Sequence, residues 1–88
     1  MANLRDTTIT GNCVPDANGT RNLGSTSLRW ANMYTSDLNL SNDAKGPNDI
    51  DGTTGDYTIQ EGENDLFLIN NKTGKKYKFA LIEIPDKE

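Results

Sequence analysis

The scarcity of large apolar side chains most constrains how this chain can fold. Only 17 of its 88 residues are Leu, Ile, Val or Phe, and its mean hydropathy is -0.74. This fraction of large apolar residues is close to the limit below which chains are usually intrinsically disordered. Disorder also requires high net charge or few β-forming residues, whereas this chain has a net charge of only -4 and contains ten Thr, six Ile and three Tyr. We therefore expect a chain that folds but does not fill its own core.

The usual stabilisers of a small domain are mostly missing from the sequence. A domain of this size is marginal alone and relies on disulfides, a metal or oligomerisation. Cys13 is the only cysteine, and there is no His. An intrachain disulfide and a zinc site of Cys and His are therefore excluded. We expect the chain to assemble with copies of itself and to need no cofactor.

Composition also narrows the function classes. Without His there is no His-based triad or general base, and no nucleotide-binding motif is present, so we expect no enzyme. A pI of about 4.6 disfavours nucleic acid as a partner. No apolar run approaches a membrane span, and the N-terminal MANLRDTTIT lacks the apolar stretch of a signal peptide. These features predict a soluble chain made in a reducing compartment, without membrane insertion.

The sequence divides into three segments. Residues 1–41 form an Asn-, Thr- and Gly-rich β module, residues 42–56 a nearly apolar-free loop or linker, and residues 57–88 a β-meander. The whole is expected to be mostly β.

Three strands are predicted in the C-terminal segment, forming an antiparallel meander. Residues 57–60 alternate apolar and polar, residues 66–69 are a continuous apolar run, and residues 75–84 carry apolar side chains on both faces. Between the last two, Gly74 favours a hairpin. Three strands cannot cover both of their own faces, so we expect copies of the chain to cover them. The residues predicted to pack in the core or between subunits here are Leu66, Phe67, Leu68, Tyr77, Phe79 and Ile82.

The first segment is expected to hold short strands at residues 7–10 and 37–41. Between them, a short helix over residues 26–34 could be capped by Ser25 or Thr26. The side chains predicted to form a local core around this helix are Leu23, Leu28, Trp30 and Tyr34. The alternative is that Trp30, together with Tyr34 and Arg29, forms a platform on which a sugar stacks.

Acidic residues suggest possible contact loops. Asp49-x-Asp51-Gly52 resembles the start of a calcium loop but lacks a third ligand and the closing Glu, so a solvated loop without metal is favoured. Glu61 and Glu63 flank a glycine in a turn, exposed rather than paired for catalysis. These four acids are candidate receptor contacts.

Two stretches of the sequence carry motifs that are more specific than their composition. Residues 14–16 contain a Pro-Asp turn, residues 22–25 read Asn-Leu-Gly-Ser, and residues 28–34 contain an Arg-Trp pair followed by a Tyr. This pattern resembles one found in tailed-bacteriophage fibre and appendage proteins. Residues 57–62, 65–70 and 73–77 resemble C-terminal pieces of structural proteins from marine and cyanobacterial phages.

The resemblance implies an intertwined or stacked homotrimer that contacts other virion structural proteins. The chain would then be a component of a virion tail fibre or capsid appendage, assembled in the host cytoplasm and contributing to host adhesion. The alternative is a carbohydrate- or receptor-binding fibre tip. Fibre chains usually carry a virion-anchoring domain before such a segment, so we expect either a short standalone product or a part of a longer one.

Overall fold

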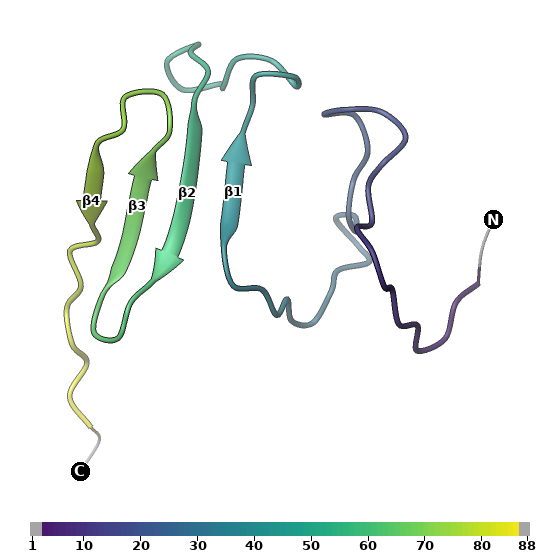
Figure 1. The fold of residues 1–88 in the computed structure, drawn as a ribbon, viewed down its shortest axis with the longest axis horizontal. Helices are drawn as coiled ribbons and strands as arrows, with labels where there is room; N and C mark the ends of the chain where they lie inside the picture. The colour runs from purple at the N-terminus through teal and green to yellow at the C-terminus, as the bar shows by residue number, and fades with distance from the viewer. Residues whose placement is uncertain (1–2, 87–88) are drawn as a thin grey trace.

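Four short strands between residues 38 and 78 form one antiparallel sheet (Figure 1). The computed structural model describes residues 3–86, so residues 1–2 and 87–88 of the predicted outer segments lie outside the described part. Neighbours in the sheet are neighbours in sequence. The prediction of a mostly β protein is confirmed. In chain order the strands are β1 (Leu38–Ser41), β2 (Asp56–Glu61), β3 (Leu66–Asn70) and β4 (Lys76–Lys78).

The predicted meander is present as β2, β3 and β4, but β1 extends it to four strands. β1 coincides with the strand expected at residues 37–41 and pairs with β2, so that Leu38 lies opposite Ile59 and Leu40 opposite Tyr57. This register places the leucines of β1 beside apolar residues of β2, which is how cross-strand pairs stabilise a sheet. The long connection over residues 42–55 returns the chain between two adjacent antiparallel strands.

The last strand is much shorter than predicted. It ends at Lys78 rather than near Ile84. In the register of β3 with β4, the position opposite Phe79 is Leu66, and the Phe79 N–H still donates a 2.9 Å hydrogen bond to the Leu66 carbonyl. Leu66 is the first residue of β3, and the residues before it form the turn from β2. The apolar residues after Phe79 therefore have no backbone partner in this sheet.

The hairpin between β3 and β4 forms as predicted. Gly74 adopts a φ of 78°, and its N–H donates a 2.7 Å hydrogen bond to the Asn70 carbonyl. The Asn70 side-chain oxygen accepts from the Lys72 N–H at 3.0 Å. A side chain other than glycine is disfavoured at this φ.

The helix predicted over residues 26–34 is wrong, because residues 3–86 contain no helix. The Ser25 N–H donates to the Leu28 carbonyl at 2.9 Å, and the Leu28 N–H donates to the Ser25 hydroxyl at 3.1 Å. This local pairing replaces the bonds of a first helical turn. A helix of two turns also needs a packed face to offset its nucleation cost, and Trp30 and Tyr34 are exposed.

The strand predicted at residues 7–10 does not form either. The arm, which we define as residues 3–37, lies beyond the β1 edge of the sheet in Figure 1, and no strand runs beside residues 7–10 there. A single strand without a partner leaves its backbone groups unpaired, so the segment stays irregular.

The arm approaches the rest of the chain at Gly19. A Cβ on Gly19 would lie 3.0 Å from the Ala44 Cβ and 3.1 Å from the Lys45 backbone nitrogen. Within the arm, Arg21 Nε and Nη2 donate to the two Asp16 carboxylate oxygens at 2.7 and 3.1 Å. This ion pair closes the loop that carries Gly19.

The single chain has no hydrophobic core among the residues described. The buried residue is Thr58, which is 8% exposed. The radius of gyration is 17.0 Å, against about 12 Å expected for a compact domain of this length. The open shape agrees with the scarcity of apolar residues. It leaves the apolar positions of the sheet available for contacts beyond the single chain.

Candidate functional site

The strand register divides the sheet into two chemically different faces. Residues directly opposite one another across strands share a face, and residues alternate between faces along a strand. Leu38, Ile59, Leu68 and Tyr77 therefore form one row across all four strands. We call this side the apolar face; Glu61 and Asn70 also lie on it, and its apolar residues are Leu38, Leu40, Tyr57, Ile59, Leu66, Leu68 and Tyr77.

The opposite side, the polar face, is held by side-chain hydrogen bonds. The Thr58 hydroxyl donates to Asn39 Oδ1 at 2.7 Å and accepts from Asn71 Nδ2 at 2.9 Å. Asp56, Lys76 and Lys78 lie on the same side by register, together with Phe67 and Ile69 of β3. The most buried position of the chain is therefore polar. A sheet covered on one side normally buries its apolar face and leaves the polar one in water.

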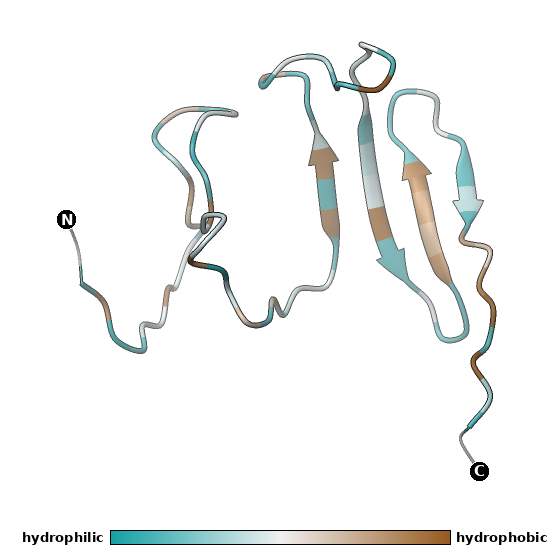
Figure 2. Ribbon diagram, turned by 180° about the vertical axis from the view of Figure 1, so that it is seen from behind, coloured by the Kyte–Doolittle hydropathy of each residue, from teal (hydrophilic) through white to brown (hydrophobic). Residues whose placement is uncertain are grey.

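The apolar face is only partly shielded. Leu38 is 39% exposed, and Leu40 and Tyr77 are each 48% exposed. Tyr57, Ile59 and Leu68 at the middle are half-buried by their neighbours in the sheet. In the ribbon coloured by hydropathy, no segment lies over the sheet, and a further hydrophobic stretch follows β4 in the C-terminal tail (Figure 2).

The predicted packing residues are distributed over the two faces of the sheet, the segment that follows β4 and the arm. Leu66, Leu68 and Tyr77 lie on the apolar face, whereas Phe67 lies on the polar face. Phe79 is half-buried just after β4, and Ile82 is exposed in the tail. The arm residues of the predicted local core, namely Leu23, Leu28, Trp30 and Tyr34, are all exposed. That local core does not form within the single chain, and their packing between subunits stays a prediction.

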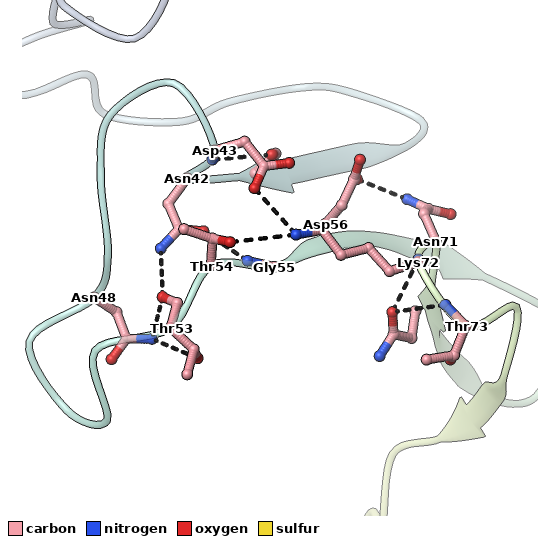
Figure 3. Close-up of polar contacts among 12 residues, drawn as sticks. Asn42, Asp43, Asn48, Thr53, Thr54, Gly55, Asp56, Asn71, Lys72 and Thr73 are labelled. Atoms are coloured by element: carbon pink, nitrogen blue, oxygen red, sulfur yellow. Dashed lines mark hydrogen bonds and ion pairs between the residues drawn. The ribbon is translucent and has the colours of Figure 1, made fainter.

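The loop over residues 42–55 is ordered by its own side chains (Figure 3). Asn48 Oδ1 accepts from the N–H groups of Ile50 and Asp51 at 2.7 and 2.9 Å. Asn42 bridges the two ends of the loop, because its Nδ2 donates to the Thr53 carbonyl and its Oδ1 accepts from the Gly55 N–H at 2.8 Å. The predicted loop is thus a folded turn structure rather than a free linker.

A hollow of about 470 Å³ lies between this loop and the end of the apolar face. Leu40 and Tyr57 supply its apolar part, and Asn42, Asn48 and Asp51 are among its polar lining. Those polar groups already bond one another or the loop backbone; for example, Asn48 Nδ2 donates to Asp51 Oδ1 at 2.8 Å. Their arrangement is accounted for by the loop itself.

Two carboxylates at this end of the sheet have pKa values below the ordinary 3.8. The pKa of Asp43 is lowered mainly by Lys72, whose Nζ lies 3.1 Å from Asp43 Oδ1. The pKa of Asp51 is lowered by the Thr53 hydroxyl, which donates at 2.8 Å, and then by Asn48. Hydrogen bonds to the ionised form cause both shifts.

The four acidic contact candidates do not come together. Asp51 lines the hollow, and Asp49 lies on the same loop. Glu61 is the last residue of β2, and Glu63 lies in the turn between β2 and β3, which Figure 1 shows at the opposite end of the sheet. Among residues 3–86 no group of three or more Cys, Asp or Glu side chains is placed to hold a metal ion.

Sequence reasoning missed Asn39, Thr58 and Asn71. The alternation of the two strands shows that Asn39 and Thr58 point away from the leucines, but it does not show that they meet. Their contact depends on pairing across 19 residues of sequence.

Comparison of the chain with protein-family models, with curated proteins and with solved structures gave no match. In the part of the chain that the structure describes, there is also no helix of the length and hydrophobicity needed to cross a membrane.

Proposed function

We propose that this chain is one of three identical subunits of a virion fibre or appendage. It acts through assembly with its copies and with other virion structural proteins, and through adhesion to the host, rather than through catalysis. The observation that carries the proposal is an ordered four-stranded sheet with one partly exposed apolar face and no buried hydrophobic residue among those described. A sheet of this kind requires a partner to complete its core.

The subunit number and the virion setting rest on the resemblance of residues 14–34 to phage fibre proteins. The structure gives several motif residues local roles that are consistent with it. Asp16 and Arg21 close one loop, and Ser25 and Leu28 close a second. Such short loops expose the aromatic residues of the motif, including Trp30 at 67% exposure.

Native mass measurement tests the proposal directly. At low micromolar concentration we expect a species of about 29 kDa, three times the 9.7 kDa of the chain. Electron microscopy of that species should show particles with threefold symmetry. A stable, cooperatively melting single chain over the same concentration range would contradict the proposal.

A carbohydrate- or receptor-binding fibre tip is the second candidate. It is favoured by the exposure of Trp30 and by the hollow beside Tyr57. Aromatic rings stack on the apolar faces of sugars. A glycan array with the wild type, Trp30→Ala and Tyr57→Ala tests it. Loss of glycan binding in a variant that still assembles identifies its site, and no wild-type binding removes this candidate.

A further inference from the structure

We propose that the apolar face is the surface by which this chain binds a second copy of itself. The inference deepens the proposed function and rests on it, because it takes the partner to be an identical subunit. It concerns the row of Leu38, Ile59, Leu68 and Tyr77 with Leu40 and Tyr57 beside it. The polar face would then remain in water, with its hydrogen bonds already satisfied.

The distribution of charge selects this face. Among strand residues, the apolar side carries one carboxylate, Glu61, at the end of β2. The polar side carries Asp56, Lys76 and Lys78. Identical subunits each have a formal charge of -4 and repel one another. A contact through the nearly uncharged face avoids placing like charges opposite each other.

The area of the face indicates how much of the second copy must take part. Four strands about 4.8 Å apart and about five residues long span roughly 300 Å². A stable interface buries about 800 Å² on each partner. The sheet face alone therefore supplies less than half of what is required. The arm and the C-terminal tail carry further exposed apolar residues, such as Leu28, Trp30 and Ile82.

This shortfall favours a whole copy of the chain over a short peptide as the occupant. A copy contributes its own apolar face together with its arm and tail, whereas a single added strand contributes only a few side chains. A copy is also present whenever the chain is made. Because the described chain has no hydrophobic core of its own, its partner has to be available when it folds.

Substitution of adjacent residues on β1 tests the face. Leu40 lies on the apolar side, and the next residue, Ser41, lies on the polar side. We expect Leu40→Asp in the full chain to raise the dissociation constant of the assembly at least about tenfold, since a leucine contact is replaced by a buried charge. Ser41→Lys, which places a charge on the polar side opposite Asp56, should leave it within about threefold of wild type. Sedimentation velocity over a dilution series measures both.

A second measurement does not depend on disrupting the assembly. In a Cys13→Ser background, Leu40→Cys and Ser41→Cys place a thiol on either side of the same strand. Alkylation of the Leu40→Cys thiol should slow by about tenfold when the protein is concentrated enough to assemble, because buried thiols react slowly. The Ser41→Cys thiol should react at the same rate in both conditions.

The outcomes separate the two proposals. Slower alkylation at position 40 alone, with weaker assembly of Leu40→Asp, supports the apolar face as the interface. A wild type that assembles while Leu40→Asp assembles equally tightly overturns this inference and leaves the proposed function standing. A wild type that stays a single chain at every concentration overturns both, and the face would then belong to a different protein.

Discussion

The Thr58 hydroxyl donates a 2.7 Å hydrogen bond to Asn39 Oδ1, joining the middle of β2 to β1 on the polar face. The same hydroxyl accepts from Asn71, which follows β3. The Thr58 side chain, at the most buried site of the chain, thus connects β2 with β1 and with the residue that follows β3. The polar side of the sheet is stabilised by specific bonds, while the apolar side depends on what covers it.

We predict that Thr58→Val destabilises the sheet by about 1 kcal/mol. Valine preserves the shape and the β-branch of threonine but removes the bonds to Asn39 and Asn71. The midpoint of urea unfolding measures the change. Thr8→Val, at an exposed position in the arm, is the control and should leave the midpoint unchanged. If Thr58→Val and wild type unfold at the same urea concentration, these hydrogen bonds make no net contribution to stability.

The hairpin between β3 and β4 should depend on the backbone conformation of Gly74. Its φ is 78°, and a Cβ there would meet nothing within 4 Å, so conformation alone sets the cost. We expect Gly74→Ala to cost about 1 kcal/mol in unfolding free energy. Gly74→Asn should cost less, because asparagine tolerates this region. Equal unfolding free energies for Gly74→Ala and wild type would contradict the prediction.

Contact of the arm with the rest of the chain should be sensitive to Gly19. Its φ is 73°, and an added Cβ would come within 3.0 Å of Ala44. We expect Gly19→Ala to release the arm and to increase the rate of tryptic cleavage after Arg29 about tenfold. Gly11→Ala, where a Cβ would meet nothing within 4 Å, is the matched control. Cleavage at the wild-type rate in Gly19→Ala would mean that the arm is held elsewhere.

The loop over residues 42–55 should lose stability in acid. Hydrogen bonds from Thr53 and Asn48 hold the pKa of Asp51 below its ordinary 3.8. A carboxylate with a lowered folded pKa stabilises the folded state above its unfolded pKa, and this contribution disappears as the pH falls through the folded value. Amide exchange at Thr53, followed below about pH 4, should accelerate. In Asp51→Asn this acceleration should be smaller. If the pH dependence of amide exchange in Asp51→Asn equals that of wild type, Asp51 is not the group responsible for the loss of stability.

We predict that Phe79→Asp abolishes assembly and folding together. Phe79 is half-buried after β4, and its register position lies opposite Leu66 on the apolar face. A carboxylate there would be desolvated in any contact made by that face. Circular dichroism and native mass measurement report the two losses. A variant that is folded and monomeric would show instead that the fold does not depend on assembly.

Local features of this protein were predictable from sequence alone. Alternation identified β1 and β2, the apolar run identified β3, and Gly74 identified the hairpin, because each depends on neighbouring residues. Composition predicted a chain without enough apolar residues for its own core. The assignment of Leu66, Leu68 and Tyr77 to packing positions follows from the same patterns, and the structure places all three on the apolar face.

The remaining features of the fold depend on pairing between strands whose residues are far apart in the sequence. The last strand stops at Lys78 because β3 begins at Leu66 and offers no backbone beyond it. The helix over residues 26–34 failed because helical spacing requires a packed face, and only tertiary structure shows that no such packing exists there. The meeting of Asn39, Thr58 and Asn71 likewise depends on strand register. Sequence periodicity assigns a residue to a face, but only the register determines which residue lies opposite it.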